Sequence, residues 1–125
     1  MTLRKHLTRW LPAVLLMAVI FVFSSIPSDE MPSFDWADLL VKKGGHALGY
    51  GLLALSYARG LRSYAWPESS RSRRRRCFVA FLMVVLYAVS DEYHQSFTPG
   101  RHPSIWDVFI DSGGAALALL RAKRV

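Results

Sequence analysis

The chain has 125 residues, of which 52% are hydrophobic and 20% charged, and its formal net charge is +7. This length allows one domain, and the composition fits a basic soluble protein as well as a membrane protein, so the distribution of residues has to decide. The single cysteine, Cys77, excludes an intrachain disulfide, and no cysteine and histidine spacing typical of a metal site occurs.

Four apolar segments follow one another, with charged residues concentrated between them. We predict membrane-spanning helices over residues 10–26, 44–61, 76–95 and 105–120. These segments are at the short end of the roughly 17–25 residues that a helix needs to cross a bilayer. The first is like the core of a signal peptide, but no A-x-A cleavage signal follows it, so we expect a retained span. The predicted fold is all-α, a single membrane domain over residues 1–125 built as a four-helix bundle.

Basic residues lie almost entirely on one side of the predicted bundle. The two terminal tails and the connection between the second and third segments hold 13 of the 16 lysines and arginines, but only Glu68 of the nine acidic residues. Because basic loops stay in the cytoplasm, we predict a protein of the cytoplasmic membrane with both termini cytoplasmic.

The densest basic cluster, Arg73–Arg76, would also suit nucleic acid. Its place directly before an apolar segment favours anchoring to anionic lipid headgroups, so no nucleic-acid partner is expected. We expect the surrounding Ser/Arg segment, Ser69–Arg76, to form a flexible loop.

The two acidic connections are external in this topology. The first, residues 27–41, combines four acidic residues with apolar ones such as Trp36, which indicates a short helix lying at the membrane interface. The second, residues 96–104, contains the turn signal Pro99-Gly100.

Polar and ionisable residues gather at the predicted external ends of the second, third and fourth segments. Ionisable groups at membrane depth are costly, which makes them candidates for a functional site. The candidate catalytic residues are His46, Glu92, Asp91 and Asp107. The candidate ligand-binding residues are Arg101, Gln95, Tyr50 and Asp111.

This set combines groups that move protons with groups that bind anions. His46 and Glu92 are the acid/base candidates, and Arg101 would bind a phosphate or carboxylate. No cofactor is expected. Carboxylates with a histidine would also suit a divalent metal, but the sequence does not require one and no residue is assigned as a metal ligand.

Helical spacing relates the acidic residues to one another. Asp107 and Asp111 are four residues apart and therefore share a face of the fourth helix. Asp91 and Glu92 are about 100° apart around the third helix, so we expect at most one of them to point into the bundle.

Several of the candidates also have a purely structural interpretation. Ser104-Ile105-Trp106-Asp107 matches a capping box, which would account for Asp107 but not for Asp111, one turn deeper. The glycine pairs Gly45/Gly49 and Gly113/Gly114 are typical of closely packed helices.

Other candidates have equally simple explanations. Glu92 and His94 would face water if they lie on the outside of the third helix. Independently of this, Arg101 could be only the ion-pair partner of Asp91 or Asp107. His46 could be only a residue that forms a hydrogen bond between helices.

Four motifs at these positions resemble the VanZ-like family. They are Ser24-Ser25-Ile26-Pro27, then Lys43 with His46 and Tyr50, then the block Glu92-x-x-Gln95-x-Phe97-x-Pro99-Gly100-Arg101, and finally Asp107 with Gly114. The resemblance covers nearly the whole chain and implies a multi-pass bacterial membrane protein. Asp111 departs from the family pattern, which has asparagine there. The family takes its name from an accessory protein of teicoplanin resistance, which makes glycopeptide resistance one context, but the resemblance implies no particular activity.

Two functions fit these observations. In the first, the external site binds or acts on an envelope lipid, a lipid-linked precursor or a lipoglycopeptide, as the density of acid/base groups favours. In the second, the protein is a non-enzymatic structural or accessory protein whose polar cluster is a packing network, as the small size of the bundle favours. The sequence leaves open whether the protein is an enzyme.

Overall fold

The computed structural model describes residues 2–27, 35–64 and 66–122, and for residues 35–41 it describes the backbone alone. These residues form four helices and no strand. The helices are α1 (Leu3–Ser24), α2 (Asp35–Leu61), α3 (Ser70–Gln95) and α4 (Ile105–Arg121). The prediction of an all-α, four-helix fold is therefore confirmed.

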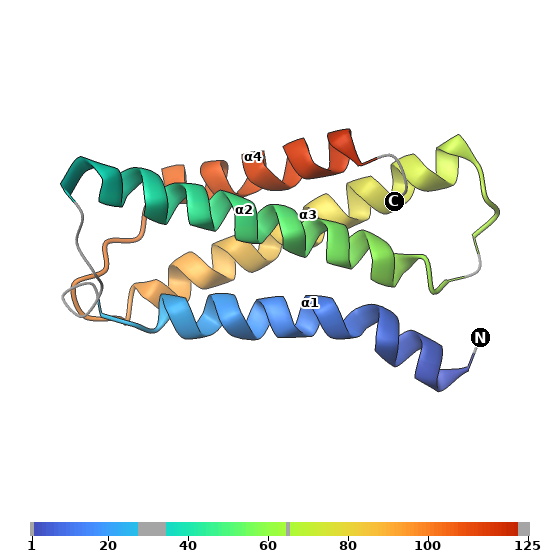
Figure 1. Cartoon of the computed structure of the whole chain (residues 1–125), viewed down its shortest axis with the longest axis horizontal. Helices are drawn as coiled ribbons and strands as arrows, with labels where there is room; N and C mark the ends of the chain where they lie inside the picture. The colour runs from blue at the N-terminus through green and yellow to red at the C-terminus, as the bar shows by residue number, and fades with distance from the viewer. Residues whose placement is uncertain (1, 28–34, 65, 123–125) are drawn as a thin grey trace.

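The helices run side by side along the long axis of the molecule (Figure 1). Both termini and the connection between α2 and α3 lie at one end, while the end of α1, the start of α2 and the connection between α3 and α4 lie at the other (Figure 1). α2 is the central helix, because it packs against the other three helices more extensively than any other helix does, above all against α4.

Apolar side chains cover the outside of the bundle as well as its core. The core is built largely from α2, whose buried hydrophobic residues, among those described, are Tyr50, Leu53, Ala54, Tyr57, Ala58 and Leu61. On α1, outward-facing side chains between 53% and 59% exposed include Leu11, Val14, Leu15, Phe21 and Val22. By length and composition, α1 and α3 are each long and apolar enough to cross a membrane.

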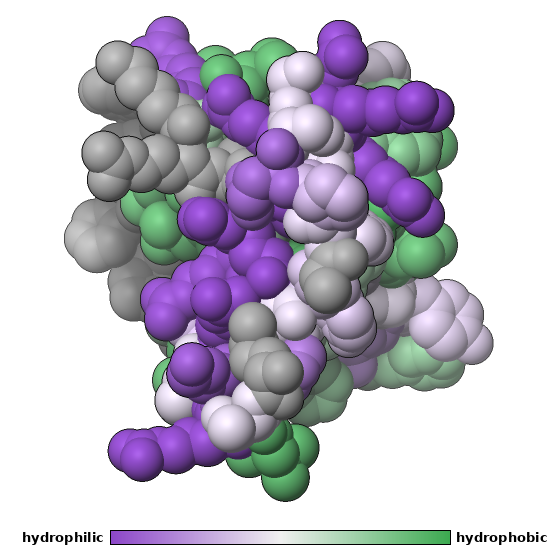
Figure 2. Space-filling model, turned by 90° about the vertical axis from the view of Figure 1, so that its right-hand side faces the viewer, coloured by the Kyte–Doolittle hydropathy of each residue, from purple (hydrophilic) through white to green (hydrophobic). Residues whose placement is uncertain are grey.

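The end that carries the termini is strongly hydrophilic. Figure 2 looks at this end and shows polar side chains gathered on it. Its exposed arginines include Arg4, Arg59, Arg62, Arg71, Arg73, Arg74, Arg75 and Arg121. The basic and apolar parts of the sequence are thus separated along the molecule, as the charge pattern predicts.

Two connections differ from the prediction because helices continue past their apolar runs. The Ser/Arg segment is helical rather than a loop: Ser69 accepts a hydrogen bond from the Ser72 amide, and arginine is a good helix former. Residues 35–41 are the first turns of α2 rather than a separate short helix, since no proline interrupts them. Residues 28–34 of that connection lie outside the described residues.

Small residues bring α2 and α4 close together. A Cβ atom on Gly114 would lie only 2.3 Å from the carbonyl oxygen of Ala47, so a glycine is needed at this crossing. By contrast, a Cβ on Gly45, Gly49 or Gly113 would meet nothing within 4 Å. The packing role predicted for these glycines is therefore right for Gly114 and wrong, within this chain, for the other three.

Candidate functional site

The candidate residues lie together at the end of the bundle opposite the termini. They come from the middle of α2, the last turns of α3, the following turn and the first turns of α4. Seven of them line two adjoining cavities there, and the eighth, Asp91, is hydrogen-bonded to Tyr50. The convergence inferred from the sequence is thus seen in the fold.

Two pairs of side chains connect α2 with α4. Nζ of Lys43 donates a hydrogen bond of 2.9 Å to Oδ1 of Asp107. One turn further along, Nδ1 of His46 lies 3.6 Å from Oδ1 of Asp111. The face that Asp107 and Asp111 share therefore points at α2, and the close crossing at Gly114 keeps both pairs in register.

Asp111 is the least satisfied of these groups. Its side chain is only 1% exposed, and neither carboxylate oxygen accepts a hydrogen bond from a described residue. The 3.6 Å separation from His46 is longer than a normal hydrogen bond. Because a buried carboxylate without donors is costly, this position needs explanation.

A buried hydrogen-bond network joins α2, α3 and α1. The hydroxyl of Tyr50 donates to Oδ2 of Asp91 over 2.9 Å. Nε2 of Gln95 lies 3.3 Å from the same Asp91 oxygen and 3.3 Å from Oγ of Ser24. All four side chains are buried, so the network holds three helices at one depth.

The turn after α3 holds the end of α1. Nε of Arg101 donates to the Ile26 carbonyl over 3.1 Å, and Nη2 donates to the Phe23 carbonyl over 3.0 Å. Carbonyls at a helix C-terminus lack partners within the helix. Arg101 gives the Phe23 carbonyl a donor in addition to the Ile26 amide, and it also gives a donor to the Ile26 carbonyl just past the helix. Gly100, with a φ of 73°, provides the left-handed turn that directs Arg101 toward α1. The Ser24–Pro27 and Gln95–Arg101 motifs are thus contact partners.

Glu92 caps the start of α4. Its Oε2 accepts from the Ser104 amide over 3.0 Å, while Oγ of Ser104 accepts from the Trp106 amide over 3.2 Å. In a capping box the third residue of the helix would accept from the cap amide. The capping-box interpretation of Asp107 therefore does not hold, because Asp107 binds Lys43 and Glu92 reaches the cap amide from α3.

The two acidic residues at the end of α3 are both buried. Asp91 is 4% exposed and Glu92 7%, so the prediction that only one points inward is wrong. α2 covers one side of this helix end and the start of α4 covers the other. His94 is half-buried rather than freely solvated, since its ring stacks on Phe21 with centroids 4.4 Å apart.

The two cavities differ in chemical character. The smaller, of about 170 Å³, is lined almost entirely by polar and charged residues. They include three carboxylates, those of Glu92, Asp107 and Asp111, and three cations, those of Lys42, Lys43 and Arg101. The larger, of about 340 Å³, lies between α1 and α2 and has a mainly apolar wall. The residues that line both are Lys42, His46 and Arg101.

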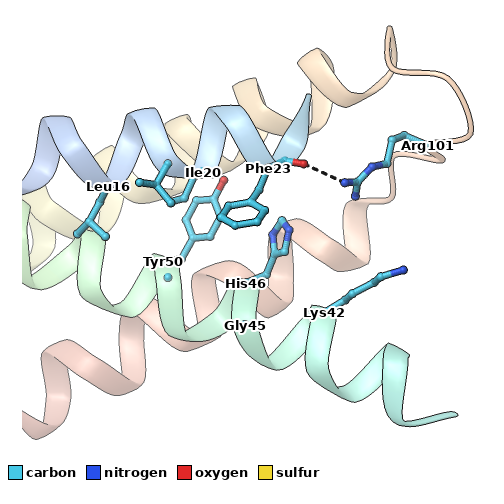
Figure 3. Close-up of a pocket in the computed structure, with 10 residues that line it drawn as sticks. Leu16, Ile20, Phe23, Lys42, Gly45, His46, Tyr50 and Arg101 are labelled. Carbon is cyan, nitrogen blue, oxygen red and sulfur yellow. Dashed lines mark hydrogen bonds between the residues drawn. The ribbon is translucent and has the colours of Figure 1, made fainter. Parts of the chain in front are cut away.

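Figure 3 shows the larger cavity. Leu16, Ile20 and Phe23 of α1 face Tyr50 and His46 of α2, and Lys42 and Arg101 lie beyond His46 at one end (Figure 3). On α2, Gly45 and Gly49 leave the wall without side chains. Because these two glycines have no side chains, a cavity is left between α1 and α2 at their positions. They therefore border a cavity and do not form a close helix contact.

Sequence reasoning missed two contributors to the site. Lys42 lines both cavities. The sequence could have indicated it, because Lys42 is one of only three basic residues that lie outside the arginine-rich side. Ser24 was noted only as part of a motif, although it is buried and bonded to Gln95. Within the described ranges, no three His, Cys, Asp or Glu side chains are grouped closely enough to hold a metal ion.

Comparison with known proteins agrees with the motifs. The family model described as VanZ/LLP1 matches residues 9–125. No curated protein and no solved structure matches the chain. The match covers most of α1 and all of the other three helices, together with both cavities. It also includes the contact of Arg101 with the Phe23 and Ile26 carbonyls, which we call the clasp on α1. The chain therefore belongs to the VanZ/LLP1 family.

Proposed function

We propose that the protein is a multi-pass protein of the cytoplasmic membrane that binds a membrane lipid at the external end of its helices. The observation that carries this proposal is the junction of a polar and an apolar cavity at Lys42, His46 and Arg101. A phospholipid has the same two parts, an acyl chain and a charged headgroup, with a phosphate between them.

Several features support the membrane location and orientation. α1 and α3 are long and apolar enough to span a bilayer, and apolar side chains cover the outside of α1. The exposed arginines gather at the end that carries both termini. In a bacterial inner membrane that end would stay in the cytoplasm, and all four helices would span the membrane. Both cavities would then open at the outer leaflet.

The larger cavity suits an acyl chain. Its volume of about 340 Å³ is within the range of roughly 300–1,000 Å³ seen for small-molecule sites. Leu16, Val19, Ile20 and Phe23 provide an apolar wall on α1. Cations at one end complement a phosphate, because lysine and arginine form charge-assisted hydrogen bonds with phosphate oxygens.

His46 is the acid/base candidate that this arrangement favours. It lies at the junction of the cavities, where the bond between headgroup and lipid backbone would lie. Glu92 is the weaker candidate, because its carboxylate already accepts a hydrogen bond from the Ser104 amide.

A packing network is the second candidate function, and specific contacts favour it for part of the cluster. Asp91, Tyr50 and Gln95 form the buried network that joins three helices, and Arg101 holds the end of α1. Asp91, Tyr50 and Gln95 would serve mainly to hold the bundle together, and His46, Asp111 and Lys42 would face the ligand. Arg101 would do both, because it holds α1 and also lines the two cavities.

The experiment is to fill the larger cavity and measure the lipid that remains bound. Gly49→Leu places a side chain in the cavity, and the open space where its Cβ would lie lets it enter without moving a helix. Gly113→Leu is the matched control, since its Cβ also meets open space and Gly113 lines neither cavity.

Phospholipid that co-purifies with each detergent-solubilised variant is quantified by mass spectrometry. We expect a severalfold loss for Gly49→Leu and none for Gly113→Leu, with equal melting temperatures. Equal lipid content in both folded variants would overturn the proposal. Comparing the lipids of cells with and without the gene then tests whether a bound lipid is also modified.

A further inference from the structure

We propose that the bound lipid carries an ammonium group in its headgroup and that the Asp111 carboxylate receives it. This inference rests on the proposed function and names the class of phospholipid, one whose headgroup holds both a phosphate and a primary amine. It concerns the polar cavity, whereas the test of lipid binding above concerns the apolar one.

Asp111 has acceptor capacity that the protein does not fill. Its side chain lines the polar cavity, is 1% exposed, and has two oxygens without a hydrogen-bond donor among the described residues. A carboxylate accepts up to about four hydrogen bonds, and a primary ammonium offers three donors together with the opposite charge. A buried carboxylate that faces a cavity is a site for such a group.

The other carboxylates of this cavity are already engaged. Glu92 accepts from the Ser104 amide at 3.0 Å, and Asp107 accepts from Lys43 at 2.9 Å. The position with unfilled capacity is therefore Asp111, on the face of α4 that points at His46 of α2.

The order of groups along the two cavities matches a zwitterionic lipid. The apolar wall of α1 comes first, Lys42 and Arg101 lie where the cavities meet, and Asp111 lines only the polar cavity. Acyl chain, phosphate and ammonium follow one another in the same order in such a lipid. A purely anionic headgroup would leave the Asp111 carboxylate without a cationic partner from the ligand.

The competing explanation is that His46 alone neutralises Asp111. A protonated imidazole at 3.6 Å would balance the charge without any ligand. In that case the cavity has no use for an ammonium group, and lipid headgroups would bind without regard to their amine.

The test measures headgroup preference of the purified full-length protein. Equal amounts of phosphatidylethanolamine, phosphatidylcholine and phosphatidylglycerol with identical acyl chains are offered in detergent, and the bound lipid is measured by native mass spectrometry. We expect a preference of about tenfold for the ethanolamine lipid, the ratio that one charge-assisted hydrogen bond supplies. The choline headgroup lacks N–H donors and should bind more weakly although its charge is the same.

Asp111→Asn should remove this preference and leave the total amount of bound lipid unchanged, because the apolar cavity is intact. Asp107→Asn is the control in the same cavity, and it should keep the preference because Asp107 is already paired with Lys43. Lack of preference in the native protein, or a preference that survives Asp111→Asn, would overturn the inference. The wild-type comparison of headgroups decides the matter even if the variant does not fold. If the protein shows no headgroup preference, the loss of lipid expected for Gly49→Leu is unaffected. The two experiments can therefore contradict the headgroup inference and the proposed function separately.

Discussion

Arg101 fixes α1 through bonds that end on main-chain oxygens. Its guanidinium donates to the carbonyl of Phe23, in the last turn of α1, and to that of Ile26, two residues past the end of the helix. A planar group with five donors suits two acceptors held in a fixed geometry, and lysine does not reproduce it. One side chain thus positions the wall of the apolar cavity that α1 provides.

Arg101→Ala should lower both the yield of folded protein and its melting temperature. At least two hydrogen bonds are lost, each contributing about 0.5–1.5 kcal/mol, so we expect a shift of several degrees. Thermal unfolding in detergent, followed by size-exclusion chromatography, measures it. Arg101→Lys should recover part of the loss, and His102→Ala, at the exposed neighbouring position, should have no effect. A melting temperature unchanged by Arg101→Ala would show that the clasp adds no stability.

The partners of individual side chains were less predictable than their depth. The sequence placed polar groups from three helices at one end, because charge asymmetry and helical spacing are local properties. Asp107 matched a capping pattern with Ser104, yet it binds Lys43, 64 residues away in the chain. That contact depends on the register between α2 and α4, which no local pattern contains.

At the scale of elements, the crossing of α2 and α4 determines which groups meet. Gly114 has no side chain, so α4 approaches α2 closely enough that a Cβ atom at this position would overlap the main chain of Ala47. This closeness sets the register of Lys43 with Asp107 and of His46 with Asp111. The number of helices predicted from the sequence is correct. The predicted second and third helices are too short, because they are limited to the apolar segments 44–61 and 76–95. α2 and α3 continue through charged residues at Asp35 and Arg76, where membrane-span rules expect an end.

Gly114→Ala should destabilise the protein, whereas Gly113→Ala should not. At Gly114 the added methyl would lie 2.3 Å from the Ala47 carbonyl oxygen, so the helices must separate at a cost of about 1–3 kcal/mol. At Gly113 it meets nothing within 4 Å, and alanine favours a helix over glycine by about 1 kcal/mol. Melting temperatures of the two variants, which differ by one position, give the comparison. Equal melting temperatures would mean that the crossing can relax freely.

At the scale of the whole molecule, the bundle has two chemically different ends. Exposed arginines surround the termini, and the polar groups at the opposite end are mainly buried around two cavities. The charge pattern of the sequence predicts this polarity. It could not reveal the larger cavity, because this arises where Gly45 and Gly49 face α1 without side chains.

Labelling of introduced cysteines tests the orientation. In a Cys77→Ser background, a cysteine is placed at exposed position His102, at the cavity end, or at exposed position Arg71, at the arginine-rich end. A membrane-impermeant maleimide should label His102→Cys in intact cells with a permeabilised outer envelope, and Arg71→Cys only after the inner membrane is disrupted. Labelling in the reverse order would place the cavities on the cytoplasmic side.

The clasp on α1 also bears on how the protein can diversify. Carbonyl oxygens are common to every amino acid, so Arg101 recognises where α1 ends and not which side chains it carries. Leu16, Val19 and Ile20, which face the apolar cavity, lie outside this contact. Substitutions along α1 can therefore change the length and width of that cavity while the helix stays docked. Evolution, or an engineer, can tune chain-length selectivity on α1 without rebuilding the rest of the bundle.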